Sequence, residues 1–390
     1  TSAAAERVLR ETGLDDARFD SIEAALFALV YGDRVNRAAR FCARLADQAA
    51  ARRAPAWQAR LAAIQAEIAL RQGDAKAAER HSRSALAHLS PRAWGVAAGA
   101  LIATLVLARV ATGRPEAAAE QLTRPIPEAL FETRFGLLYR YARGQYQLTR
   151  GRPATAVEDF RACGRQMRAW GIDLPAFVPW RGAAAAGYLL VKAHQTARKL
   201  MEEQLARPGA DGSRTYGVSM RQLAAVSDVR DRPGLLRKAV ESLQAAGDRL
   251  ELAHALADLS RAHHALGEPS RARAMAHHAL KLARECHAEP LARALLSWHA
   301  EAAPEGPQSP VAPAEDETSL LSEAERRVAE LVSMGHTNRE VARSLHITVS
   351  TVEQHLTRVY RKLNINGRND LSMYLGLRST GSGPQRAVSR

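Results

Sequence analysis

The chain has 390 residues, enough for two or three domains, and carries 55 Lys and Arg against 41 Asp and Glu, a net charge of +14. Its three cysteines, Cys42, Cys163 and Cys286, lie far apart and form no C-x-x-C motif. This spacing argues against a disulfide framework or a cysteine metal site and predicts buried thiols in a reducing cytoplasm. No signal peptide is seen, and the start at Thr1-Ser2 suggests a processed protein or part of a longer one.

Residues 1–300 show no strand pattern, because alanine dominates and apolar residues recur at helical spacing. A short pattern repeats in this region: an apolar residue, then a glycine, then an alanine five positions after the glycine. It occurs around Gly73, Gly113, Gly151 and Gly267, with a half-copy at Gly247. Each copy indicates a helix, a glycine turn and a second helix, which resembles tetratricopeptide-like repeats. We therefore predict an all-α helical-repeat domain over residues 1–300, interrupted by an exposed loop near residues 211–213.

The longest apolar run, Gly95 to Ala108, is too short and too rich in Ala and Gly for a membrane span, so we expect a buried helix. The histidines of residues 254–299 group loosely, but their pairs are adjacent in sequence and point apart, which favours helix-surface residues over a metal site. No G-x-x-x-x-G-K-[ST], G-x-S-x-G or H-E-x-x-H motif occurs. We predict neither an enzyme nor a cofactor, metal or membrane partner.

Charge is distributed unevenly along the chain: residues 1–300 carry +14, residues 301–317 carry −5 and residues 318–390 carry +5. The middle stretch, EAAPEGPQSPVAPAEDE, has four prolines and no basic or aromatic residue, which predicts an extended acidic linker. The tail, residues 379–390, is predicted to be disordered. The basic balance of residues 318–390 suits a nucleic acid partner, whereas the arginines of residues 1–300 alternate with Ala and Glu as on solvated helix faces.

Residues 318–378 contain three short helices with sharp boundary signals. Ser322 precedes an apolar series that Gly335 ends, as an N-cap and a C-cap would. Thr337 to Glu340 forms a capping-box pattern for a second helix that runs to about residue 345. Thr348 can cap a third helix, whose apolar positions follow a 3.6-residue period to residue 363. The link between the second and third helices is only about two residues long, which indicates a helix-turn-helix.

The outer face of the third helix, about residues 349–363, carries side chains suited to DNA. Glu can accept a hydrogen bond from the cytosine amino group, and Gln can pair with adenine in the major groove. Arginine, lysine and hydroxyl side chains suit phosphates. The residues predicted to contact DNA on these grounds are Thr348, Ser350, Thr351, Glu353, Gln354, Thr357, Arg358, Arg361 and Lys362.

This segment resembles the LuxR-type (NarL/FixJ-type) helix-turn-helix. Leu321-Ser322 with Glu325, the run Gly335 to Ala342, Ile347-Thr348, Thr351-Val352, His355-Leu356 and Lys362-Leu363 match the family motifs at fixed spacing. The resemblance adds Asn338 and Arg368 to the predicted DNA contacts, and it implies a fourth, dimerisation helix carrying Leu371, Tyr374 and Leu375. The run Thr348 to Leu363 is most similar to the large ATP-binding LuxR-type regulators of actinomycetes, which place a helical-repeat domain before the DNA-binding domain.

Three positions depart from the family pattern. Glu323 replaces a proline, where a carboxylate in the first turn of a helix is favourable. Asn364 replaces a glycine and also tolerates a left-handed cap. Glu353 stands where the family often has a base-reading lysine, so the usual target sequence of the family is not expected here.

The sequence as a whole predicts a cytoplasmic, sequence-specific transcriptional regulator, more readily an activator, that binds double-stranded DNA as a homodimer and can contact RNA polymerase. The repeat domain would bind an effector or a protein. The alternative is a helical-repeat scaffold whose main activity is partner binding. A third hypothesis, an ATP-switched regulator, requires a nucleotide site that the sequence lacks.

Overall fold

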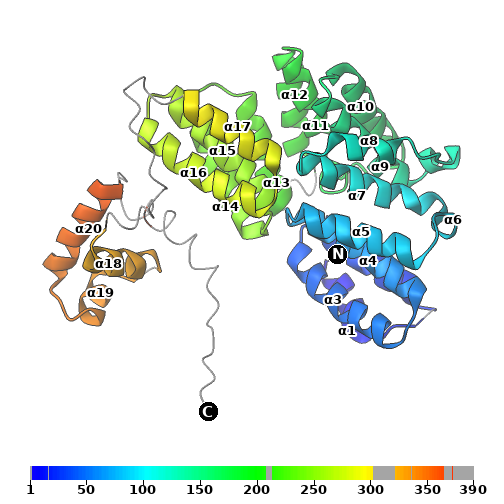
Figure 1. Cartoon of the computed structure of the whole chain (residues 1–390), viewed down its shortest axis with the longest axis horizontal. Helices are drawn as coiled ribbons and strands as arrows, with labels where there is room; N and C mark the ends of the chain where they lie inside the picture. The colour runs from blue at the N-terminus through cyan, green and yellow to red at the C-terminus, as the bar shows by residue number, and fades with distance from the viewer. Residues whose placement is uncertain are drawn as a thin grey trace. The chain divides into compact units, whose positions relative to one another are not determined.

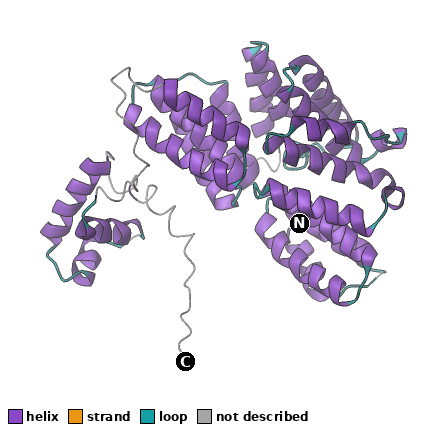
Figure 2. Cartoon of the chain, viewed as in Figure 1, coloured by secondary structure: helices purple, strands orange, loops and turns teal. Residues whose placement is uncertain are grey.

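The computed structural model describes residues 2–15, 17–207, 213–301, 321–334, 336–363 and 371. Within these residues every regular element is a helix, and no strand occurs (Figure 2). The chain divides into two compact units, Thr1–Ala302 and Ala303–Arg390. The all-α fold class predicted from the sequence is confirmed.

The N-terminal unit is a succession of helices, most of which pack on a neighbour along the chain (Figure 1). Its first half contains α1 (Ser2–Glu11), α2 (Phe19–Tyr31), α3 (Val35–Ala51), α4 (Pro55–Arg71), α5 (Ala75–His88), α6 (Pro91–Trp94), the 3-10 turn η1 (Gly95–Ala97), α7 (Ala98–Ala111) and α8 (Pro115–Leu122). Its second half contains η2 (Glu128–Glu132), α9 (Arg134–Thr149), α10 (Pro153–Ala169), α11 (Trp180–Leu190), α12 (His194–Leu205), α13 (Ser213–Ala225), α14 (Arg232–Ala246), α15 (Arg249–Ala265), α16 (Pro269–Glu285) and α17 (Glu289–Glu301).

The glycines of the sequence pattern lie in the turns between paired helices. Gly73, Gly113, Gly151 and Gly267 have φ values of 77°, 75°, 68° and 74°, in the left-handed region that glycine adopts without steric cost. They join α4 to α5, α7 to α8, α9 to α10 and α15 to α16, and the two helices of each pair contact one another. The predicted order of helix, glycine turn and helix is therefore present at all four copies, while the tetratricopeptide-like classification stays a prediction.

Segments far apart in the sequence also meet within this unit. The Arg249 N–H at the start of α15 donates to the Gln72 carbonyl in the α4–α5 turn at 3.2 Å. A Cβ on Gly73 would lie 2.3 Å from the Leu250 backbone nitrogen, so this approach requires glycine. The Thr215 N–H of α13 likewise donates to Asp33 Oδ2 at 2.7 Å. These contacts tie the beginning and the end of the unit together.

The predicted buried helix is α7. Leu101, Leu105 and Val106 are at most 2% exposed, and α7 packs on α4, α5 and α9. The stretch Arg92–Ala111 has the length and apolarity of a membrane span, but half of its most apolar window is buried within the unit. Packing within the unit accounts for the apolar residues of this helix.

The three cysteines are buried and unpaired, as predicted. Burial raises the pKa of the Cys42 and Cys163 thiols to about 12, so both stay protonated near neutrality. The predicted linker begins at Glu301, which the structure places at the end of α17. Of the loop predicted near residues 211–213, Ser213 is instead the first residue of α13. Residues 211 and 212, the rest of the linker and the tail at residues 379–390 lie outside the described residues.

Candidate nucleic-acid interface

Three helices of the C-terminal unit enclose a small core: α18 (Glu323–Ser333), α19 (Asn338–Ser344) and α20 (Val349–Leu363). Each of them packs on the other two. The core residues are Leu321, Val328, Ala329, Val332, Val341, Ala342, Val352, Leu356, Val359 and Leu371. Their spacing on α20 confirms the predicted 3.6-residue period and leaves the opposite face of this helix in solvent.

The start of α18 is locked by a capping box. The Glu325 N–H donates to Ser322 Oγ at 3.3 Å, and the Ser322 N–H donates back to Glu325 Oε2 at 2.7 Å. The same Glu325 oxygen accepts a hydrogen bond from Lys362 Nζ at 2.6 Å. These donors outweigh the opposing effect of burial and hold the Glu325 pKa below its usual value, with Lys362 as the main cause. One carboxylate therefore caps α18 and fastens the end of α20 to it.

The starts of α19 and α20 are both capped, and the turn between these two helices is short. Thr337 and Glu340 form the predicted capping box of α19, with the Thr337 N–H donating to Glu340 Oε2 at 2.7 Å. This hydrogen bond and that of the Thr337 hydroxyl lower the Glu340 pKa. His346 has a φ of 53° between the helices, and Thr348 Oγ1 accepts from the Thr351 N–H at 3.2 Å. The predicted N-cap of the third helix is thus present.

The polar face of α20 is exposed along its described length. Ser350, Glu353, Gln354, Thr357 and Arg358 are all exposed, while the core residues of the same helix are buried. The Thr357 hydroxyl donates to the Glu353 carbonyl at 2.8 Å. This face combines acceptors, an amide and a guanidinium on one rigid helix, which are the groups that read base edges and phosphates.

The hydroxyls of Thr348 and Thr351 lie 2.8 Å apart at the N-terminus of α20; Thr348 is exposed and Thr351 is half-buried. Asn338, at the start of α19, is half-buried. Several predicted contact residues lie outside the described part of the structure: the Arg361 side chain, Arg368, Tyr374 and Leu375.

One predicted role needs correction. Leu371 was assigned to a dimer contact, but it is fully buried in the core of its own unit, and a side chain enclosed there has no surface left for a partner. Lys362 was assigned to a phosphate; its side chain is 36% exposed, and its ammonium also binds the buried carboxylate of Glu325. Lys362 therefore positions α20, and its phosphate contact stays a prediction.

Some features of the unit went unnoticed in the sequence. The first capping box could have been found, because Ser322-x-x-Glu325 has the same spacing as Thr337-x-x-Glu340. Two exposed arginines of α19, Arg339 and Arg343, lie one turn apart on the surface beside the turn. The Glu325–Lys362 contact could not have been found, because it joins residues on two different helices.

Comparison with known proteins agrees with this geometry. Residues 319–375 match the family model described as bacterial regulatory proteins, luxR family. The segment is 34% identical over 59 residues to the putative HTH-type transcriptional regulator YhjB of Escherichia coli, covering 15% of this chain and 30% of that protein. It is 36% identical over 59 residues to the oxygen regulatory protein NreC of Staphylococcus carnosus, covering 15% and 27%.

The response regulator protein VraR of Staphylococcus aureus is 33% identical over 55 residues, 14% of this chain and 26% of that protein. The chain thus spans less than a third of the length of these relatives. Residues 319–375 are a helix-turn-helix domain of the LuxR family of bacterial regulatory proteins.

Proposed function

We propose that this protein is a sequence-specific, DNA-binding transcriptional regulator in which α20 enters the major groove. The observation that carries the proposal is the exposed polar face of α20, held on a three-helix core by the α19–α20 turn. In helix-turn-helix proteins the N-terminal part of the second helix meets base edges. Ser350, Glu353 and Gln354 occupy that part of α20, and Arg358 follows one turn later, where a phosphate contact is expected.

Glu353 should give this interface a preference for cytosine. A carboxylate near DNA is repelled by the phosphates unless it accepts a hydrogen bond, and the cytosine amino group is the donor that the major groove offers it. Gln354 would pair with adenine beside it. The hydroxyls of Thr348 and Thr351, at the positive end of the α20 dipole, would receive a phosphate.

The wider roles follow from the resemblance of residues 319–375 and from the size of the N-terminal unit. The relatives are named as a transcriptional regulator, an oxygen regulatory protein and a response regulator, which supports a role in regulated transcription in the cytoplasm. We propose that the chain acts as a homodimeric activator that can contact RNA polymerase, with the N-terminal unit sensing an effector or recruiting a protein.

Binding-site selection from random DNA with the full chain tests the proposal. Against the selected site, Gln354→Ala should reduce the preference over random DNA by about 1–3 kcal/mol. Arg358→Ala should weaken binding to both DNAs about equally, because a phosphate contact carries no sequence information. Arg326→Ala, which removes an exposed arginine of α18, should change neither.

If selection enriches no sequence, the scaffold alternative replaces this function. If Gln354→Ala leaves the preference intact, the placement of α20 in the groove is wrong.

A further inference from the structure

A basic groove crosses three helices of the N-terminal unit, far in sequence from the helix-turn-helix. It has a volume of about 450 Å³ and lies among α10, α11 and α12; these are the green helices of Figure 1, where α11 contacts both of the others. This volume falls within the range of small-molecule sites, about 300–1,000 Å³. The groove is large enough for a metabolite and too small for a folded partner.

One wall of the groove is a row of arginines on α10. Arg161, Arg165 and Arg168 follow one another at intervals of four and three residues, so they share one face of the helix, and all three are exposed. None of them forms an ion pair with a carboxylate in the described part of the chain. Arg143, by contrast, reaches α10 from α9 and binds Asp159 through two hydrogen bonds of 2.9 and 2.6 Å. Like charges one turn apart repel, so an anion bound beside the row would stabilise it.

The opposite wall is rigid because a buried aspartate holds it. Asp173 is 5% exposed and accepts two hydrogen bonds from Arg181, at 2.8 and 2.6 Å, and one from the Trp180 indole at 3.1 Å. Burial opposes ionisation of Asp173, but these donors prevail and lower its pKa. The Trp180 ring lies under the guanidinium groups of Arg168 and Arg181, at 5.0 and 4.3 Å from its centroid. These contacts therefore preorganise this wall of the groove for a ligand.

Donors remain unused inside this wall. Arg181 Nε is buried without a hydrogen-bond partner in the described structure, 3.7 Å from Glu203 Oε2. Glu203 is the one acidic residue among those that line the groove. The Tyr188 hydroxyl is near the rim, where Arg161 donates to it at 3.1 Å. The lining thus presents three guanidinium groups that have no carboxylate partner, against the single carboxylate of Glu203, which lies beside Arg181.

We propose that this groove binds a small polyanion, a molecule with at least two phosphate or carboxylate groups. The planar guanidinium fork matches both oxyanions bidentately, and three of them along one helix require more than one such group. The half-buried Leu200 supplies apolar surface for the body of the ligand, while the buried Trp180 ring supports the guanidinium groups above it. The site gives a ligand class to the sensing role proposed above, and only its regulatory meaning rests on that role.

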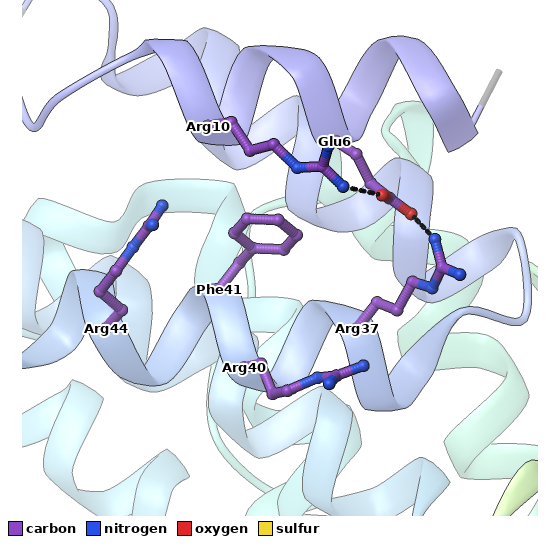
Figure 3. Close-up of a pocket in the computed structure, with 6 residues that line it drawn as sticks. All are labelled: Glu6, Arg10, Arg37, Arg40, Phe41 and Arg44. Carbon is purple, nitrogen blue, oxygen red and sulfur yellow. Dashed lines mark hydrogen bonds and ion pairs between the residues drawn. The ribbon is translucent and has the colours of Figure 1, made fainter.

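A second basic pocket in the same unit has a different character and provides a control. It is lined by Glu6, Arg10, Arg37, Arg40, Phe41 and Arg44 and has a volume of about 410 Å³. Figure 3 shows the Glu6 carboxylate between Arg10 and Arg37, and the Arg10 contact is 2.9 Å long. Glu6 is 8% exposed. The Glu6 carboxylate thus already neutralises part of the positive charge of this pocket, so we expect it to bind an added anion more weakly.

Isothermal titration calorimetry of the full chain without DNA tests the proposal, with pyrophosphate and citrate as probes at constant ionic strength. At least one probe should bind saturably, and the stronger of the two identifies phosphate or carboxylate as the preferred group. Arg165→Gln should weaken that binding about tenfold, because it removes a charge-assisted hydrogen-bond donor. Arg40→Gln, the same charge change in the second pocket, should weaken it less than about twofold.

Circular dichroism verifies that both variants keep the helical content of the parent chain. The proposal is overturned if neither probe binds, if both variants weaken binding equally, or if only an oligoglutamate peptide binds, since the groove would then be a peptide site. Selection of DNA by the same chain is measured separately. A chain that binds a probe but prefers no DNA would refute the regulatory function and leave the groove in place, while the reverse result would refute the groove alone.

Discussion

Breaking the ion pair between Glu325 and Lys362 should loosen α20 from α18. The carboxylate and the ammonium are 2.6 Å apart, and their side chains are 4% and 36% exposed. A hydrogen bond to a charged group contributes about 1.5–3 kcal/mol, and the partial exposure of the lysine screens part of this. We therefore expect a coupling of about 1–2 kcal/mol between the two side chains.

A double-mutant cycle measures this coupling. Glu325→Gln, Lys362→Met and the double variant are compared with the parent chain by hydrogen exchange of the α20 amides, which reports local opening of the C-terminal unit. The pair Glu323–Arg327 on α18 is the matched control, because its atoms are 2.8 Å apart but its side chains are 67% and 64% exposed. The control pair should couple by at most about 0.5 kcal/mol.

The same pair predicts a pH dependence with a definite sign. The Lys362 contact lowers the Glu325 pKa in the folded unit below the ordinary value of 4.5. The stabilisation is then fully present above about pH 4.5 and is lost as the pH falls through the lowered folded value. The reasoning is refuted if the buried pair couples no more strongly than the exposed pair, or if Lys362→Met leaves the acid dependence of α20 exchange unchanged.

Three further changes and one control substitution test the packing. Leu371→Ala should destabilise the C-terminal unit by about 2–5 kcal/mol because it opens a cavity in the core; a loss below about 0.5 kcal/mol, measured by the same exchange, would place this leucine at the surface instead. Thr348→Val should cost about 1 kcal/mol and speed exchange of the first α20 amides, since the N-cap acceptor is lost. Gly164→Ala should lower the thermal midpoint of the N-terminal unit, at a cost of about 1–3 kcal/mol, because a Cβ there would lie 2.5 Å from Trp180. Gly234→Ala, where no atom lies within 4 Å of the added Cβ, should raise that midpoint slightly.

The helix-turn-helix was predictable because its signals are local. Thr337 and Glu340 are three residues apart, and a capping box needs only that spacing and the residue types. The glycine turns of the N-terminal unit were predictable for the same reason, since glycine adopts a positive φ after a helix without steric cost. Where a few consecutive residues decide the conformation, the sequence alone was sufficient.

The contacts of Lys362 and Leu371 depend on tertiary packing and were therefore not predicted. Both residues match the pattern of a surface contact when read along their own helices. Lys362 becomes a positioning residue only because Glu325, which belongs to another helix, presents a buried carboxylate to it. Leu371 leaves the surface only because α18, α19 and α20 together form a core around it.

The basic groove of the N-terminal unit likewise depends on tertiary contacts that the sequence does not show. Along the sequence Arg161, Arg165 and Arg168 look like the other arginines of a solvated helix face. The structure separates them from their neighbours, because Arg143 and Arg181 are each bound to a carboxylate while these three are not. What distinguishes an unpaired arginine from a paired one is the residue on the adjoining helix. A ligand site of this kind is invisible in the arginine pattern of α10 and becomes visible only once α11 and α12 are packed beside it.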